Sequence, residues 1–200
     1  NMISIKNTKL SKNSSSLIVS YLRDVQITCG NYPFVEDIYN FINTIKNNLS
    51  VELEKATNVY GGMTDWKFFV DHPLFNKFLH WFINQHQLTN QELRNFYDKK
   101  QVVDAWGNQL KKGHSVTCHT HDCFHGILYL TGGNPLILPE LNIEIVPKPG
   151  DYYFFPPQIK HYVPEVNNDS ERYSVIFNIN EVRNWERNKK LNNLISDFSK

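Results

Sequence analysis

Three histidines have the residue type and the spacing that metal ligation requires. His119 and His121 are two residues apart, and His161 follows forty residues after His121. Side chains two apart on a β-strand point to the same face, so His119 and His121 would project together. With His161 on a neighbouring strand they would leave open positions, which suits a redox-active iron that also binds a co-substrate and oxygen. We therefore predict a metal site made of these three imidazoles.

An arginine and a serine further along the chain have the spacing of a carboxylate site. Arg172 lies eleven residues after His161, and Ser174 is two residues further on. On a strand these two side chains would share one face. A guanidinium fork beside a hydroxyl matches the geometry of a carboxylate. The sequence therefore predicts that an anionic ligand is anchored close to the metal site.

The sequence offers an alternative to His121 as the second metal ligand. Asp122 directly follows His121 and is the nearest acidic residue. A regular strand turns it to the opposite face, so only a local bulge would aim its carboxylate inward. We therefore favour His121 over Asp122, and we expect His114 and His125 not to bind metal.

The cysteines admit a zinc site but do not favour it. Cys118 and Cys123 flank the histidine pair, and Cys29 is the third cysteine. Zinc modules usually present two cysteines two to four residues apart with a distant second pair, which is not the spacing here. We expect the thiols to pack as small apolar groups. An odd number of cysteines without a disulfide framework predicts a reducing, cytoplasmic location.

Taken in order, these residues and their surroundings resemble a known family. The stretch over residues 55–180 is similar to the 2-oxoglutarate/Fe(II)-dependent dioxygenases, in particular to the prolyl-4-hydroxylase-like branch of phages and marine bacteria. The matching pieces are Thr57-Asn58-Val59, Met63-Thr64-Asp65-Trp66, Trp106-x-Asn108, Gly113, His119-x-His121, Gly126-x-x-Tyr129, Gly150-Asp151, Phe155-Pro156, His161, Arg172-x-Ser174 and Phe177-Asn178. The usual family motif has an acidic residue at the position that His121 occupies in this chain.

The resemblance implies a fold, an activity and roles for further residues. The implied fold is mainly β with flanking helices, a double-stranded β-helix or jelly roll. The implied activity is the Fe(II)- and 2-oxoglutarate-dependent hydroxylation of an unactivated C–H bond, with a prolyl residue in a peptide as the family-level substrate. Arg172, with Ser174 beside it, would hold the far carboxylate of 2-oxoglutarate, and Tyr129 would reach the same carboxylate or pack in the core. Asn108 would support the site or contact the substrate.

Two other functions stay open at this point. A cupin-like dioxygenase with three histidines works without 2-oxoglutarate and needs no anchoring arginine, so Arg172 and Ser174 argue against it. A jelly-roll binding module without enzymatic activity would have no use for inward-pointing histidines. The sequence leaves the substrate undecided among peptides, free amino acids and nucleotides.

Composition limits the class of protein and its partners. The chain has 200 residues, of which 40% are hydrophobic and 14% aromatic, which is typical of a globular domain with a substantial core. A net charge of +1 gives no reason to expect a nucleic-acid partner, and no apolar run is long enough to span a membrane. We expect a small-molecule or peptide substrate and molecular oxygen as partners, and leave open a homodimer.

The pattern of apolar residues predicts one domain, residues 1–200, in three parts. A helical N-terminal part covers residues 30–100, the jelly-roll core covers about 102–180, and a C-terminal helix covers 182–198. Helices are expected from Val35 to about Asn48, from Pro73 onward and over 89–99, with Thr57 to Trp66 as a lid or connecting loop. An edge strand near Val19 would follow a polar tail. In the core we expect strands near 102–110, 115–121, 126–130, 135–138, 143–146, 151–155, 161–165 and 171–179.

Overall fold

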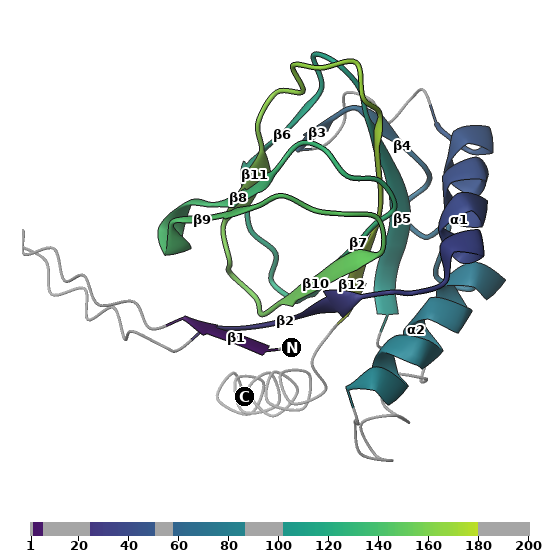
Figure 1. The fold of residues 1–200 in the computed structure, drawn as a ribbon, viewed down its shortest axis with the longest axis horizontal. Helices are drawn as coiled ribbons and strands as arrows, with labels where there is room; N and C mark the ends of the chain where they lie inside the picture. The colour runs from purple at the N-terminus through teal and green to yellow at the C-terminus, as the bar shows by residue number, and fades with distance from the viewer. Residues whose placement is uncertain (1, 6–24, 51–57, 87–101, 180–200) are drawn as a thin grey trace, which may run out of the picture.

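The structure is a computed structural model that describes residues 2–5, 25–50, 58–86 and 102–179. Two antiparallel sheets face each other around a central interior, and two helices cover the outer side of one sheet (Figure 1). This arrangement is the predicted jelly roll with helices on its outer face. Within the described residues, no helix combines the length and the apolar character that crossing a bilayer demands.

The sheets differ in size, and every pair of neighbouring strands is antiparallel. The larger sheet has seven strands in the order β1 (Met2–Ile5), β2 (Val25–Asn31), β10 (Asp151–Phe155), β7 (Phe124–Tyr129), β12 (Arg172–Ile179), β5 (Val102–Leu110) and β4 (Gly62–Met63). The smaller sheet has five strands in the order β3 (Val59–Tyr60), β6 (Ser115–His119), β11 (His161–Val163), β8 (Leu136–Leu138) and β9 (Ile143–Ile145), and a short 3-10 helix (Pro139–Leu141) joins β8 to β9.

Strand β12 runs between β5 and β7 and separates two different environments. All eight of its residues are buried, because both faces of the sheet are covered at this position. Successive side chains alternate between the faces. Val175 and Phe177 belong to the core under the helices, whereas Ile176 belongs to the core between the sheets. Ser174 lies on the same interior side and lines a cavity there.

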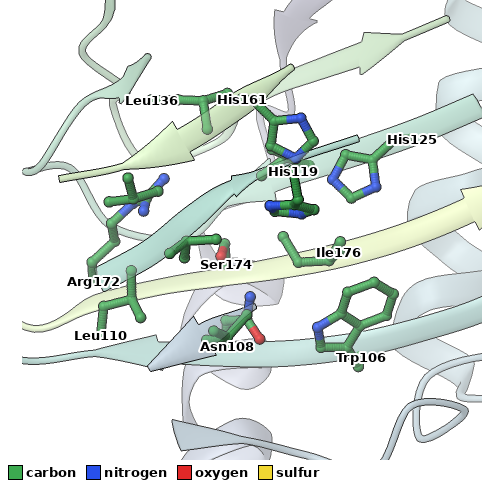
Figure 2. A pocket seen from close by; sticks show the side chains of 14 residues that line it. Trp106, Asn108, Leu110, His119, His125, Leu136, His161, Arg172, Ser174 and Ile176 are labelled. Carbon is green, nitrogen blue, oxygen red and sulfur yellow. The ribbon is translucent and has the colours of Figure 1, made fainter. Parts of the chain in front are cut away.

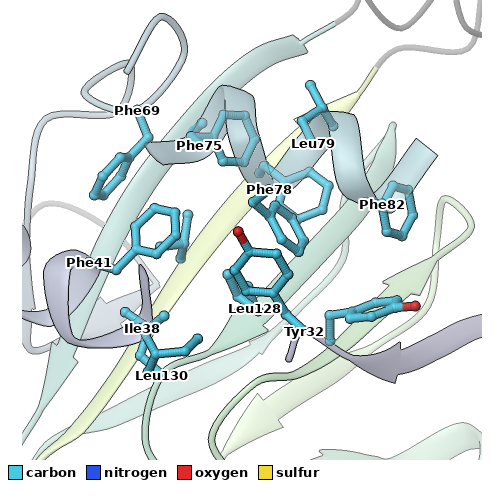
Figure 3. Packing of buried hydrophobic residues seen from close by; sticks show 14 of the residues in the cluster. Tyr32, Ile38, Phe41, Phe69, Phe75, Phe78, Leu79, Phe82, Leu128 and Leu130 are labelled. Atoms are coloured by element: carbon cyan, nitrogen blue, oxygen red, sulfur yellow. The ribbon is translucent and has the colours of Figure 1, made fainter. Parts of the chain in front are cut away.

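The two helices pack on the outer face of the larger sheet. α1 (Val35–Asn47) and α2 (Pro73–Gln85) confirm the two helices predicted for these segments. Pro73 suits the first helical position because its φ is already helical, and His72 Nδ1 accepts a hydrogen bond from the Leu74 N–H at 3.3 Å. On α2, Phe75, Phe78 and neighbouring apolar residues are buried against the sheet (Figure 3).

Aromatic rings fix the distance between α2 and the sheet. The ring of Phe177 on β12 lies 5.5 Å from that of Phe75 and 5.9 Å from that of Phe78, centroid to centroid. Beneath it, a β-carbon at Gly126 would overlap the Phe177 ring. Glycine is therefore required on β7 at this point, which gives a packing reason for one piece of the motif that the sequence singled out.

Other expectations have mixed outcomes. No strand was expected over residues 25–31, where the structure has β2 paired with β10. The segment expected to be an irregular loop from Thr57 contains the short strands β3 and β4, which pair with β6 and β5. The strand expected over 115–121 ends at His119. The helices expected over 89–99 and 182–198 and the edge strand near Val19 lie outside the described residues.

Candidate functional site

The structure brings the three predicted histidines together. His119 ends β6 and His161 begins β11, and these two residues are direct partners across the strands. His121 follows two residues after the end of β6, yet its ring lies beside the other two. Their candidate ligand atoms all lie within 4.8 Å of one another. This is the cluster that could hold a metal among the described residues.

The spacing of the rings fits nitrogen coordination. A metal about 2.1 Å from an imidazole nitrogen lies about 3.2 Å from the ring centroid, so ligands about 90–110° apart have centroids roughly 4.5–5.2 Å apart. The observed centroid distances are 4.4 Å for His119–His161, 4.9 Å for His119–His121 and 5.3 Å for His121–His161. In addition, His121 Nε2 is buried and has no hydrogen-bond partner among the residues that the structure describes. The donor set therefore fits a bound metal ion.

Hydrogen bonds to backbone carbonyls select the tautomer of two of these rings. His119 Nδ1 lies 2.7 Å from the Thr117 carbonyl, and His161 Nδ1 lies 2.9 Å from the Ile159 carbonyl. Because a carbonyl only accepts, each Nδ1 carries the proton and each Nε2 keeps a free lone pair. This is the usual arrangement behind a metal-binding histidine.

Burial favours the neutral form of the same imidazoles. Burial lowers the pKa of His121 to about 3, with further lowering from His161 and His119. Burial likewise lowers the pKa of His161 to about 4, against the bond to the Ile159 carbonyl, which raises it. The pKa of His119 is also lowered by burial. Neutral imidazole is the form that binds metal, so the site is electrostatically prepared for a cation.

Asp122 points away from the histidine cluster. Its side chain is exposed, and the Gln158 side-chain amide donates a hydrogen bond to its carboxylate. The Gln158 backbone N–H also donates to the His121 carbonyl at 2.9 Å. Gln158 adopts a positive φ of 68°, a conformation that is uncommon outside glycine. The segment before β11 thus holds the backbone at residues 121–122 with the imidazole inward and the carboxylate outward.

The predicted anchor residues form a row across three strands. Ser174 on β12 is opposite Asn108 on β5 and Tyr129 on β7. Arg172 begins β12 on the same face, is 5% exposed, and places its guanidinium carbon 5.0 Å from the centre of the Tyr129 ring. Burial raises the pKa of Tyr129, and the charge of Arg172 opposes this. A neutral phenol and a buried cation therefore lie together.

Several polar atoms of this row have no hydrogen-bond partner within the described residues. They are Arg172 Nε, Tyr129 Oη and Asn108 Oδ1, and Trp106 Nε1 beside them is also unpartnered. Buried polar atoms are nearly always satisfied in folded proteins, by protein groups, water or a ligand. Three of these residues, Trp106, Asn108 and Arg172, line one cavity, which indicates a place where a polar ligand binds.

A cavity connects the anchor row to the histidines. Its empty space, including the part open to solvent, is about 420 Å³. In Figure 2, Arg172 lies at one end, Ser174 in the middle, and His119 and His161 at the other end. None of the residues described as lining it is acidic, so Arg172 faces a space in which a carboxylate would complement its charge.

Two residues of the cavity wall were not assigned a role in the site from the sequence. Trp106 lies next to Asn108 on the interior face of β5, and His125 lies at the histidine end (Figure 2). His125 is 4% exposed and stacks on His121 with ring centroids 3.8 Å apart. The signal was present in the chain, because His125 is four residues before Tyr129 on one strand and so shares its face.

The remaining candidates lie outside the ligand cluster. His114 accepts a hydrogen bond from the Lys111 N–H at 3.1 Å through Nδ1, which closes a turn. Cys118 is exposed and Cys123 is half-buried, and neither belongs to the cluster of close ligand atoms found among the described residues. Burial raises the pKa of the Cys123 thiol, so the neutral thiol is favoured there.

Comparison with known proteins was made by sequence and by structure. No family model matches the sequence, and no curated protein is significantly similar to it. The fold is similar to that of a viral collagen prolyl hydroxylase from Paramecium bursaria Chlorella virus-1, determined as its 2-oxoglutarate complex, with a TM-score of 0.56 and 17% identity over 76% of this chain and 94% of that chain.

Two bacterial structures show the same likeness. A prolyl-4-hydroxylase from Pseudomonas putida has a TM-score of 0.54 and 13% identity over 78% of this chain and 92% of that chain. HygX from Streptomyces hygroscopicus, with nickel and 2-oxoglutarate bound, has a TM-score of 0.54 and 8% identity over 78% of this chain and 83% of that chain. The chain therefore has the fold of the 2-oxoglutarate- and iron-dependent dioxygenases, as the motif order predicted.

Proposed function

We propose that this chain is an Fe(II)- and 2-oxoglutarate-dependent dioxygenase that hydroxylates an unactivated C–H bond. The observation that carries the proposal is one cavity that has His119 and His161 at one end, with His121 clustered beside them, and buried Arg172 at the other end. Among the described residues, the Nε of Arg172 has no hydrogen-bond partner. 2-Oxoglutarate is a dianion with two carboxylates, so it complements a metal cation and a guanidinium at the same time. The fold shared with structures that contain 2-oxoglutarate supports the same assignment.

Each residue of the site has a defined task in this proposal. His119, His121 and His161 hold the iron through neutral nitrogens and leave the other coordination positions open. Arg172 donates to the far carboxylate of 2-oxoglutarate, and Ser174 lies two positions along the same strand to add a hydroxyl donor. The bound metal supplies the oxygen chemistry, whereas the protein positions the reactants.

Two further polar groups, Tyr129 beside Arg172 and Asn108 on the cavity wall, complete the binding of the co-substrate. The Tyr129 hydroxyl is protonated at neutral pH because burial raises its pKa, so it donates to the same carboxylate as Arg172. Asn108 lies across Ser174 on the neighbouring strand and offers its amide to the co-substrate or the substrate. The aliphatic side chains between the two ends exclude water from the carbon chain of 2-oxoglutarate.

A cupin-like dioxygenase without 2-oxoglutarate is the second candidate. The observation in its favour is the third imidazole, since His121 replaces the carboxylate of the usual facial triad. Such an enzyme has no task for Arg172, which is buried and has no ion-pair partner among the described residues. Burying an unpaired charge is costly unless a ligand compensates it, so we favour the 2-oxoglutarate-dependent enzyme.

The test combines metal analysis with product analysis. Purified protein, freed of metal, is loaded with Fe(II) and supplied with 2-oxoglutarate and oxygen, and succinate is measured with and without candidate peptides and free amino acids. The proposal predicts one Fe(II) per chain and release of succinate. Binding of Fe(II) without any succinate would favour the three-histidine enzyme instead, and no binding of Fe(II) would exclude both.

A further inference from the structure

His121 lacks the support that its two neighbours in the cluster have. His119 and His161 belong to paired strands, and each is tied through Nδ1 to a backbone carbonyl. His121 lies beyond the end of β6, where no strand pairing dictates its orientation. Its backbone carbonyl accepts a hydrogen bond from the Gln158 N–H, but that bond leaves the ring free to rotate. Some other contact has to fix the imidazole.

That contact is the flat face of His125. The two rings are nearly parallel, with an interplanar angle of 10° and centroids 3.8 Å apart. His125 lies on β7 and is itself held firmly. Its Nδ1 lies 2.9 Å from Asn178 Oδ1, and Asn178 is its direct partner on β12. Because this oxygen accepts, His125 Nδ1 carries the proton, and the hydrogen bond sets the plane of the ring.

The geometry excludes His125 as a further ligand of the same ion. Ligands of one metal radiate from it, and imidazoles about 90° apart have centroids about 4.5 Å apart, with rings that are free to tilt. A parallel stack at 3.8 Å is closer than that spacing. The close ligand atoms also belong to His119, His121 and His161, and His125 is not among them.

We propose that His125, fixed by Asn178, is a positioning residue that holds the His121 imidazole in its metal-binding orientation. This inference rests on the metal site of the proposed function and adds a group that lies behind it. It explains why the buried His125 is present, although it neither binds the carboxylate of 2-oxoglutarate nor belongs to the ligand cluster. The stack takes over the orienting task that a carbonyl performs for His119 and His161.

The experiment uses the whole chain, freed of metal and titrated with Co(II), whose visible absorption reports ligand geometry. Four proteins are compared: wild type, His125→Ala, the double variant His125→Phe with Asn178→Leu, and Leu128→Ala. The double variant keeps a flat ring and replaces both partners of the hydrogen bond by apolar groups, so no buried polar atom is left unpaired. Leu128 is fully buried in the core under the helices and serves as the control for general destabilisation.

The expected result distinguishes a role of His125 in orienting His121 from a role in binding the metal and from a general loss of stability. Removing a group that orients a ligand typically weakens metal binding by about 10- to 100-fold, so His125→Ala should bind Co(II) at least about 10-fold more weakly and show an altered spectrum. The double variant should have a Co(II) affinity and a spectrum closer to those of wild type, because a flat ring again lies against His121. Leu128→Ala should bind Co(II) as wild type does.

Three results would overturn the inference. Wild-type affinity and spectrum in His125→Ala would show that the stack is dispensable. A double variant as impaired as His125→Ala would assign the effect to the lost nitrogen rather than to the lost ring. Equal weakening in Leu128→Ala would assign it to stability. If His125→Ala does not fold, the variant with leucine at both 125 and 178 replaces it, since it fills the space without a flat ring. Failure of the wild type to bind Co(II) would instead refute the proposed function.

Discussion

The two faces of strand β12 show how differently neighbouring residues of one strand can be used. Towards the helices, Phe177 packs between aromatic rings, and the Tyr173 hydroxyl donates to Glu171 at 2.6 Å. Towards the cavity, Arg172 is also buried, but its Nε has no hydrogen-bond partner in the described part of the chain. Burial alone therefore does not distinguish structure from function; the distinguishing property is whether the polar atoms are satisfied.

The contrast between the faces predicts opposite consequences for neighbouring substitutions. A change on the helix face should alter the free energy of unfolding while sparing ligand affinity per folded molecule. A change on the cavity face should alter ligand affinity while sparing the free energy of unfolding. Of the four predictions below, ordered from the largest expected effect to the smallest, the first two test this separation and the other two test the histidine cluster.

Phe177→Ala should cause the largest loss of stability. Truncating a buried phenylalanine typically costs about 3–5 kcal/mol, because transfer free energy is lost and a cavity remains. Phe177 is 1% exposed and contacts rings on α2. Urea unfolding should show the loss, while affinity for Fe(II) measured under folding conditions should stay close to wild type. A parallel loss of metal affinity would contradict the separation of the two faces.

Arg172→Ala should weaken 2-oxoglutarate binding strongly. Truncating one partner of a buried, hydrogen-bonded charge pair typically costs about 2–5 kcal/mol, which is on the order of 10²-fold or more in affinity. Calorimetric titration of the metal-loaded variant measures it. Fe(II) affinity should be nearly unchanged, because Arg172 lies at the other end of the cavity from the histidines. Unchanged affinity for 2-oxoglutarate would place the anchor elsewhere.

Metal-free protein should lose stability as the pH falls below 6.5. His121 and His161 have folded-state pKa values of about 3 and about 4, below the ordinary value of 6.5. The unfolded chain therefore takes up protons first, and the contribution of these groups is complete above pH 6.5 and is lost progressively towards pH 4. Urea unfolding at pH 7, 6 and 5 measures it in a window where few carboxylates titrate. Equal stability at pH 7 and 5 would contradict the buried neutral state of these rings.

Asp122→Ala should have the smallest effect of the four. Its carboxylate is exposed and bonded to Gln158, so both stability and Fe(II) binding should be nearly unchanged. The matched variant His121→Ala should abolish Fe(II) binding. Metal analysis of the two purified variants makes the comparison. Loss of iron in Asp122→Ala but not in His121→Ala would show that the carboxylate turns inward when metal binds.

Much of the fold could be predicted from the sequence because its strands are short, apolar and separated by turn residues. Strands β5, β10 and β12 lie within a residue of their expected limits, and both described helices begin at the predicted segments. Strands β3 and β4 were missed because two residues carry no periodic signal. Strand β2 was missed, because the glycine and asparagine at its end indicate a turn rather than a strand.

The candidate site was predictable to a similar degree, for a similar reason. Alternation on β12 places Arg172 and Ser174 on one face, as expected. The inward direction of His121 was predicted from strand alternation, but the strand ends at His119, and the observed orientation comes from contacts with Gln158 and His125. Contacts between segments distant in the chain are not encoded in local periodicity, so the role of the cavity wall emerged only from the structure.

The central claim is that one cavity binds a metal and 2-oxoglutarate together. The most direct measurement is the visible spectrum of Fe(II)-loaded protein, without oxygen, as 2-oxoglutarate is added. Chelation of Fe(II) by a 2-oxo acid should produce a weak charge-transfer band in wild type, and the titration should require far more 2-oxoglutarate in Arg172→Ala. Fe(II) that binds to the wild-type protein with no spectral response to 2-oxoglutarate would contradict the claim.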